Sequence, residues 1–203
     1  IYPLILPLPD CELLCIVRVC SALYSRDGVL EIFRSSDGGT TWERQGPVRD
    51  RSWDTVHYSD FLGTITALRD GSLLLRCDRL DMTDPDVLAF NETTGGWMPW
   101  ELCVCRSTDA GRTWSDPATM NIRHHFGEEV EPVPSGRMIE LNDGAWFLCV
   151  ETWKTHDNDG PFNLDSHALF SRDEGVTWDD KVEVAVGAPD NLSFSHGFPI
   201  ELD

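Results

Sequence analysis

Three turn-like segments of the sequence are each followed, eight residues after the turn aspartate, by a charged residue: Arg18, Asp78 and Glu151. Arg76 lies two residues before Asp78, and Arg79 directly follows it. A guanidinium group can bind a carboxylate through two parallel hydrogen bonds, and a carboxylic acid can protonate a glycosidic oxygen. This combination is typical of a site for an acidic sugar. Solvated salt bridges between loops are the alternative, and the residue types alone leave both open.

The three turns belong to one repeated segment: "LPLPDCELLCIVR" at 6–18, "ITALRDGSLLLRCDR" at 65–79 and "IELNDGAWFLCVETW" at 139–153. Each copy has a turn between two apolar, alternating runs, which predicts a β-hairpin. Side chains two residues apart lie on the same face of a strand. We therefore expect the charged positions to lie on one face, near the end of the second strand of each hairpin.

A second phrase of eight residues also occurs three times, as "SSDGGTTW" (35–42), "STDAGRTW" (107–114) and "SRDEGVTW" (171–178). We expect its Asp to accept backbone N–H groups of its own turn, its Gly to need a positive φ, and its Trp to begin the next strand and pack against a neighbouring blade. The residues concerned are Asp37, Gly39 and Trp42, then Asp109, Gly111 and Trp114, then Asp173, Gly175 and Trp178. Three equivalent aspartates are an unusual way to build one active site, so we interpret the phrase as structural.

The two repeats interleave with a period of 60–73 residues, so that one unit contains four antiparallel strands. Such units are typical of the blades of a β-propeller, and the chain is predicted to be all-β. We expect blades at about 1–56, 57–127 and 128–193, with the start of a fourth at 194–203, where "IEL" at 200–202 repeats "IEL" at 139–141. Because three blades would leave an open edge, we expect the chain to be about half of a closed propeller.

Loops on a rigid scaffold often carry function, and here the long loops lie at the end of each predicted blade that is opposite the Ser-x-Asp turns. They cover 18–30, 76–100 and 151–167, and the segments that enter the first strands at the same end are 57–63, 128–136 and 194–198. The candidate site residues therefore belong to this end of the blades.

The composition excludes several classes of partner. The chain has 35 Asp and Glu against 16 Lys and Arg, a net charge of −19, which would repel a nucleic acid. No apolar run approaches the ~18 residues of a membrane span. The seven cysteines have no zinc-ligand spacing and are expected mainly as buried small side chains, such as Cys103 and Cys105 on one strand. We expect no metal or cofactor. No signal peptide is evident, so a secreted, periplasmic or cytoplasmic location stays open.

The Ser-x-Asp-x-Gly-x-Thr-Trp phrase resembles the Asp-box, and the whole chain resembles the sialidase (neuraminidase) superfamily, blade by blade. The resemblance implies a six-bladed propeller that removes terminal sialic acid, or a related acidic sugar, from a sialoglycoconjugate. It also implies an arginine triad for the sugar carboxylate, an Asp acid/base, and a Tyr nucleophile assisted by Glu. Asp-boxes occur in non-catalytic propellers too, so the resemblance is more specific for fold than for activity.

Matched residue by residue, the resemblance makes Arg18 in "LLCIVR" a substrate-binding arginine and Asp27 in "YSRDG" the acid/base. The first arginine of the triad has no counterpart in "IYPLI" (1–5), and "SFSHGF" (193–198) has His196 where the family has Glu. No tyrosine matches the nucleophile. We therefore expect the 203 residues alone to be inactive. The alternatives are a glycan- or protein-binding propeller without catalysis, and a hydrolase or lyase for another sugar.

Overall fold

The computed structural model describes residues 4–51, 54–162, 164–187, 193–194, 197 and 199–202. Its regular structure is β-strand, apart from two single turns of 3-10 helix, Pro9–Cys11 and Arg123–His125. Within the described ranges, no helix is long and apolar enough to cross a membrane. The predicted all-β class is confirmed.

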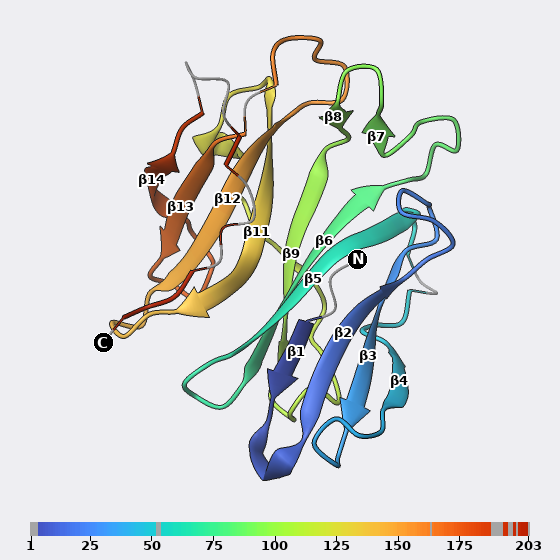
Figure 1. Cartoon of the computed structure of the whole chain (residues 1–203), viewed down its shortest axis with the longest axis vertical. Helices are drawn as coiled ribbons and strands as arrows, with labels where there is room; N and C mark the ends of the chain where they lie inside the picture. The colour runs from blue at the N-terminus through green and yellow to red at the C-terminus, as the bar shows by residue number, and fades with distance from the viewer. Residues whose placement is uncertain are drawn as a thin grey trace. The chain divides into compact units, whose positions relative to one another are not determined.

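The strands form three four-stranded sheets (Figure 1), and neighbouring strands follow one another along the chain except in the second sheet, where β7 and β8 lie between the paired strands β6 and β9 in the sequence. The first contains β1 (Leu4–Pro7), β2 (Leu13–Val19), β3 (Val29–Ser35) and β4 (Glu43–Pro47). The second contains β5 (Tyr58–Ala67), β6 (Leu73–Asp81), β9 (Trp100–Ser107) and β10 (Ala118–Thr119). The third contains β11 (Val130–Glu140), β12 (Trp146–Lys154), β13 (Ser166–Ser171) and β14 (Asp179–Ala185), and a small hairpin joins β7 (Phe90–Asn91) to β8 (Gly96–Trp97). This is the predicted blade architecture.

The chain forms two compact units. The first unit, residues 1–87 and 101–119, contains the first sheet and nearly all of the second, and the other unit, residues 88–100 and 120–203, contains the β7–β8 hairpin and the third sheet. Residues 199–202 belong to no strand of the described chain, and Phe198 and Asp203 lie outside the described residues, so the start of a fourth blade at 194–203 stays a prediction. The tripeptide 1–3 and residues 195–196, including His196, are also outside that part.

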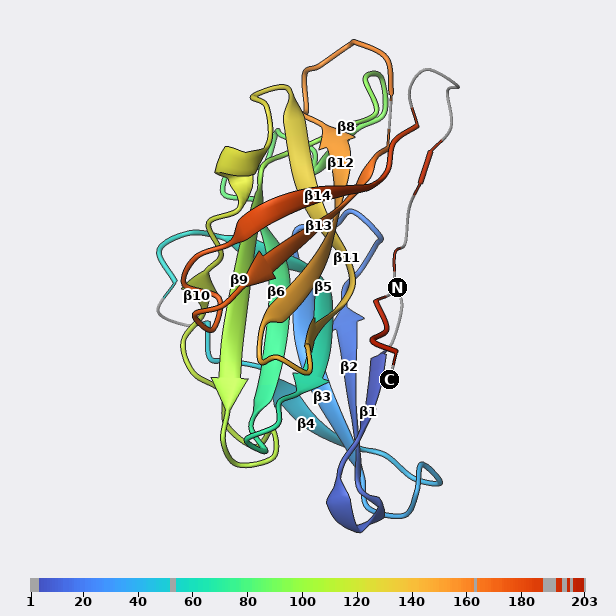
Figure 2. The same cartoon turned by 90° about the vertical axis from the view of Figure 1, so that its left-hand side faces the viewer.

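An apolar cluster joins the first two sheets within the first unit. Its buried members come from β1, β2 and β3 of the first sheet and from β5, β6 and β9 of the second: Leu6, Leu14, Ile16, Leu30, Ile32, Ile65, Leu73, Leu75, Cys77, Cys103 and Cys105. The sheets approach closely at Gly63 of β5, where an added Cβ would lie 2.8 Å from side-chain atoms of Ile16 and Leu30. In the view of Figure 2, which is turned by 90°, β2 and β3 lie beside β5. The cysteines of the cluster are free thiols that pack as small apolar side chains.

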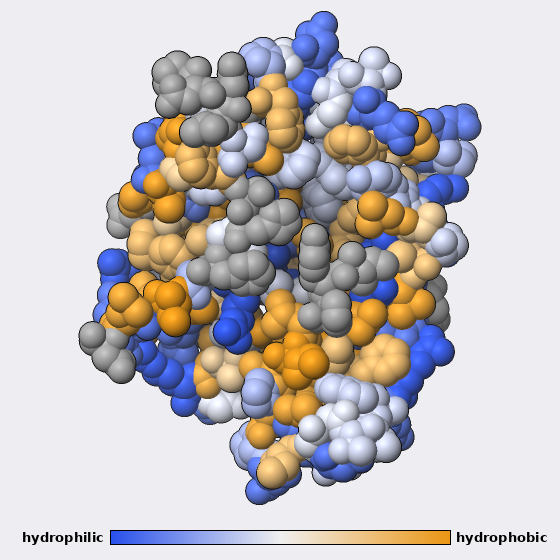
Figure 3. All heavy atoms as spheres, viewed as in Figure 1, coloured by the Kyte–Doolittle hydropathy of each residue, from blue (hydrophilic) through white to orange (hydrophobic). Residues whose placement is uncertain are grey.

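One edge of the first sheet is formed by β1, whose residue Ile5 is 49% exposed. Hydrophobic side chains gather over this strand on the surface in Figure 3. The strand is only four residues long and ends in Pro7, and both features limit pairing of an exposed edge with another chain.

The three Ser-x-Asp turns share one hydrogen-bond pattern. The Ser hydroxyl donates to the Asp carboxylate at 2.8–2.9 Å and accepts the Gly N–H at 2.8–2.9 Å. The same carboxylate accepts the N–H and the hydroxyl of the Thr at 2.6–2.9 Å. The glycines Gly39, Gly111 and Gly175 have φ of 94°, 81° and 85°. The turn therefore depends on one carboxylate and one hydroxyl, and the bonds from Thr and Ser lower the pKa of Asp109.

The tryptophans of these turns differ from the expectation. Trp42 and Trp178 lie directly before the following strand and Trp114 lies four residues before it, and each ring packs within 4 Å of the position that a Cβ on the turn glycine would take. Trp178 is 1% exposed and Trp114 packs on the cluster between the first two sheets, but Trp42 is 37% exposed. Trp42 is therefore the least buried of the three.

We expect Asp109→Ala to lower the melting temperature by about 3–10 °C, because the turn loses all the hydrogen bonds that its carboxylate accepts. The folded-state pKa of Asp109 is lowered, so its stabilisation is present above the unfolded pKa of about 3.9 and should fade as the pH falls below about 4. Thermal unfolding at pH 7 and pH 3 measures both effects. Asp116→Ala is the control, and an equal loss in that variant would contradict the assignment.

Candidate functional site

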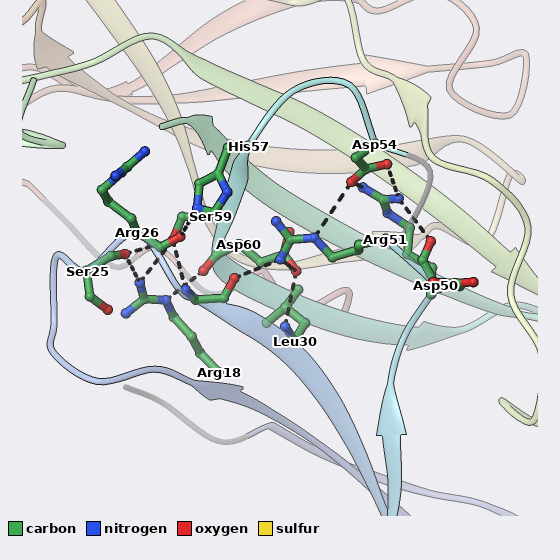
Figure 4. A network of polar contacts seen from close by, with 12 residues as sticks. Arg18, Ser25, Arg26, Leu30, Asp50, Arg51, Asp54, His57, Ser59 and Asp60 are labelled. Atoms are coloured by element: carbon green, nitrogen blue, oxygen red, sulfur yellow. Dashed lines mark hydrogen bonds and ion pairs between the residues drawn. The ribbon is translucent and has the colours of Figure 1, made fainter. Parts of the chain in front are cut away.

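The loop between β2 and β3, residues 20–28, lies at the end of the first sheet that is opposite its Ser-x-Asp turn (Figure 1). It contains Asp27 and is adjacent to Arg18, the two site residues predicted in this part of the chain. Both side chains lie in a polar network of the first unit, most of which is drawn in Figure 4.

Arg18 is 6% exposed, and its guanidinium group points into the loop. Its N–H groups donate to main-chain oxygens on both sides: Nε to Asp60 O at 2.6 Å, Nη1 to Leu23 O at 2.7 Å and Nη2 to Ser25 O at 3.1 Å. The group also lies 4.2 Å from the ring centre of Phe61. Burial lowers the pKa of Arg18, while the nearby Cys20, Asp27 and Asp60 oppose that change. In this arrangement Arg18 fixes the loop, and its donors are directed at the protein itself.

Gly28 ends the loop where three segments meet. A Cβ at this position would lie 2.5 Å from Asp60 O and 2.6 Å from Nε of Arg18. Its carbonyl oxygen accepts hydrogen bonds from Asp60 N and from Nη1 of Arg51, both at 3.0 Å. The absence of a side chain therefore lets Arg18 pass between the loop and β5.

Asp27 is exposed, and its carboxylate accepts the N–H and the hydroxyl of Ser21, each at 3.1 Å. The hydroxyl of Ser25 and the backbone N–H of Ser21 lower the pKa of Asp27 to about 2. Asp27 is therefore ionised at neutral pH in this state. A general acid must hold a proton at the working pH, so this role would require a change of surroundings when a substrate binds.

Further polar groups, which the sequence pattern did not single out, surround the loop. Arg26 donates through Nε and Nη2 to Met82 O at 3.0 and 2.6 Å, and Nε2 of His57 lies 3.0 Å from Arg26 O. These contacts join the loop to the end of β6 and the start of β5. His57 belongs to the segment 57–63 that topology assigned to the functional end, but a single histidine gave no motif.

A chain of ion pairs continues from the loop (Figure 4). Asp60 accepts the N–H of Leu30 at 3.1 Å and lies 3.6 Å from Arg51. Arg49 binds Asp54 through two hydrogen bonds of 2.9 and 2.7 Å, which lower the pKa of that carboxyl group. The network holds the segment after β4 against β5.

The charged residues of β6 do not share one face. Arg76 and Asp78 form a buried pair with 3.0 Å between Nη2 and Oδ2, and their exposed fractions are 2% and 0%. Burial raises the pKa of Asp78 to about 6, although Arg76 lowers it. Arg79 lies on the opposite face, binds Glu101 at 2.9 Å and stacks on Tyr58 at 3.8 Å. Perturbed carboxyl groups such as Asp78 are common in functional sites, but burial alone is enough to explain this one.

Glu151 belongs to β12, which is part of the other unit. It is 4% exposed, and its Oε2 accepts the indole N–H of Trp153 at 3.3 Å. The structure therefore brings Arg76 and Asp78 into contact and gives Arg18 and Arg79 separate partners. No group of three or more metal-ligating side chains occurs among the described residues.

Comparison with known proteins identifies the fold. No family model and no curated protein matches the sequence. Among solved structures, a Hadza microbial sialidase has a TM-score of 0.65 at 20% identity, over 87% of this chain and 36% of that one. A Trypanosoma rangeli sialidase in complex with sialic acid has a TM-score of 0.59 at 15% identity, over 87% of this chain and 29% of that one. An α-L-arabinofuranosidase of Fusarium graminearum has a TM-score of 0.58 at 15% identity, over 90% of this chain and 49% of that one.

The chain thus spans between 29% and 49% of these three proteins. At such low identity the likeness concerns the fold alone, which is the β-propeller of sialidases and related glycoside hydrolases. The expected resemblance to the sialidase-like propeller is confirmed at this level.

We expect Gly28→Ala to destabilise the protein by about 1–3 kcal/mol, because its Cβ would collide with a main-chain oxygen that cannot move aside. Hydrogen exchange of the loop amides in residues 20–28 should become faster. Gly127→Ala is the matched control, since an added Cβ there meets nothing within 4 Å. Equal stability of the two variants would refute the close packing at Gly28.

For Asp27, we expect an NMR titration to give a pKa of about 2. Ser21→Ala should move the pKa upward, because the carboxylate loses the hydrogen bond from that hydroxyl, whereas Ser21→Thr keeps a hydroxyl and should preserve the low value. A pKa near 4 in the unmodified protein would contradict the described contacts of Asp27.

Proposed function

We propose that the protein is a propeller glycoside hydrolase that removes a terminal sugar from a glycan, with Asp27 as its acid/base. The observation that carries the proposal is the exposed carboxylate of Asp27 on a firmly held loop, at the end of the sheet opposite the Ser-x-Asp turn. A fold shared with sialidases and an arabinofuranosidase adds support.

In the proposed reaction, a sugar ring bound over the loop excludes water from Asp27 and raises its pKa, so that the carboxyl group can protonate the glycosidic oxygen. Arg18 takes part by holding the loop through main-chain carbonyls, and so fixes where Asp27 lies. Substrate-binding roles for Arg76, Asp78, Arg79 and Glu151 remain predictions of the sequence.

The first candidate for the sugar is sialic acid or a related acidic sugar at the end of a glycan. The second is a neutral sugar, such as the arabinose released by an arabinofuranosidase. One observation favours the second candidate: the guanidinium groups of Arg18 and Arg79 donate hydrogen bonds to groups of the protein itself. An acidic sugar needs guanidinium groups that can reach its carboxylate.

The test is hydrolysis of a fluorogenic sialoside and of a fluorogenic α-L-arabinofuranoside by the full-length protein. We expect release from one of the two substrates, and Asp27→Asn should lower kcat by about 10²–10⁴-fold, the usual contribution of a positioned acid or base. Asp116→Asn, at the other end of the blades, should leave the rate unchanged.

Each outcome decides between the candidates. Release only from the arabinofuranoside would select the neutral sugar. Unchanged kcat in Asp27→Asn would remove Asp27 from the mechanism. Absence of release from both substrates would favour a propeller that binds glycans or proteins without cleaving them.

A further inference from the structure

Four aromatic side chains form an aromatic ledge in the second unit: Phe90, Trp97, Trp153 and Phe162. Phe90 and Trp97 belong to the β7–β8 hairpin, Trp153 to the end of β12 and Phe162 to the loop that follows, and the exposed Leu88 lies two residues before Phe90 in the chain. The ring centres are 5.1 Å apart for Phe90 and Trp97, 6.1 Å for Trp97 and Trp153, and 5.2 Å for Trp153 and Phe162. Trp100, 6% exposed, supports the ledge from 5.1 Å below Trp97.

The hairpin is fixed to β12 by polar contacts around His156. Its carbonyl oxygen accepts Nδ2 of Asn91 at 3.0 Å and the hydroxyl of Thr94 at 2.6 Å. Its ring nitrogen Nε2 lies 3.0 Å from Leu88 O. Trp97 also bridges to the main chain of Thr155. The ledge is therefore preorganised, and binding on it would cost little conformational entropy.

Parts of the ledge, and Leu88 near it in the chain, are open to solvent. Leu88 is 66% exposed and Phe162 is 41% exposed, while Phe90, Trp97 and Trp153 are half-buried. A contiguous group of large apolar side chains at a loop end is typical of a binding site. The rings meet at interplanar angles of 54°, 84° and 67°, so a ligand that has an apolar face of its own can pack on ring faces or ring edges.

The charges around the ledge restrict the ligand further. The carboxylates of Glu92, Asp157 and Asp159 are exposed in the loops that form it. Lys154 is 7% exposed, and its Nζ donates to Gly160 O at 2.9 Å. These carboxylates repel an anionic ligand, in agreement with the net charge of −19 of the whole chain. A neutral ligand fits this surface better than an acidic one.

We propose that the aromatic ledge binds neutral sugar rings of a glycan. The C–H groups on one face of such a ring carry partial positive charge and pack on the negative face of an aromatic ring, and the hydroxyl groups at its edge stay hydrated. The choice of a sugar as ligand rests on the proposed function. The ledge would then hold neutral units of the glycan and reject an acidic one.

The test measures binding of lactose, arabinobiose and N-acetylneuraminic acid to the full-length protein by calorimetry and by tryptophan fluorescence. We expect at least one neutral disaccharide to bind and the acid to bind at least about tenfold more weakly at this site. The double variant Leu88→Ala/Phe162→Ala should weaken disaccharide binding about tenfold, because stacking area is lost while the buried rings stay in place.

Val176→Ala is the matched control, since Val176 is 76% exposed in the Ser-x-Asp turn at the other end of the same sheet. Its affinity should equal that of the unmodified protein. Absence of disaccharide binding at about 10 mM, or equal binding by the double variant, would overturn the proposal. Preference for N-acetylneuraminic acid that depends on Leu88 and Phe162 would overturn it as well.

The binding test of the ledge and the hydrolysis test of the proposed function can fail independently. Disaccharide binding that is lost in the double variant, in a protein without hydrolase activity, would refute the hydrolase and keep the ledge. Hydrolysis of the fluorogenic substrates with no disaccharide binding at the ledge would refute the ledge and keep the hydrolase.

Discussion

A sheet that is apolar on both faces is stable only where another layer covers each face, and β6 shows this constraint most strictly. All residues from Leu73 to Leu80 are buried, so both faces of the strand are covered. One face packs on the first sheet through Leu75 and Cys77. Because the side chains of such a strand are buried, exposed reactive side chains are found in the loops at the strand ends. The Ser-x-Asp turns occupy one of those ends.

The same constraint decides what happens to charged residues within the strands. A buried charge needs a partner nearby, and these residues find it inside the protein. Asp78 has Arg76 on its own strand, Arg79 has Glu101 on β9, and Arg18 has the carbonyl oxygens of its loop. Charges that in the sequence are typical of a substrate site therefore also act as structural elements. Asp27, which lies beyond the strands, stays exposed.

Most of the fold could be predicted from the sequence, because alternating runs and a repeated turn are local signals. The spacing of eight residues from each turn aspartate also agrees with the structure. The strands β2, β6 and β12 each begin three residues after their turn aspartates, at Leu13, Leu73 and Trp146. Arg18, Asp78 and Glu151 are therefore equivalent positions. Their partners could not be predicted, because these depend on where loops and neighbouring strands place carbonyl oxygens and opposite charges.

The aromatic ledge was beyond prediction for a related reason. Trp97 and Trp153 are distant in the sequence, and they meet because Gly96 lets the hairpin lie against Thr155 and His156. The dense aromatic sequence "GGWMPW" (95–100) was the one local signal. It predicts a packed loop and says nothing about which strand that loop packs on.

The loop that carries Asp27 and the aromatic ledge are stabilised in the same way. A long loop that leaves a sheet has carbonyl oxygens without strand partners, and each must find a donor. In the first unit Arg18, near the end of β2, supplies donors to Leu23 and Ser25. In the other unit His156, just beyond β12, contacts Leu88 O through its ring and holds Asn91 and Thr94 through its own carbonyl. Side chains at the ends of second strands thus make the loops rigid, and rigid loops can hold Asp27 and the ledge in positions fixed before a ligand arrives.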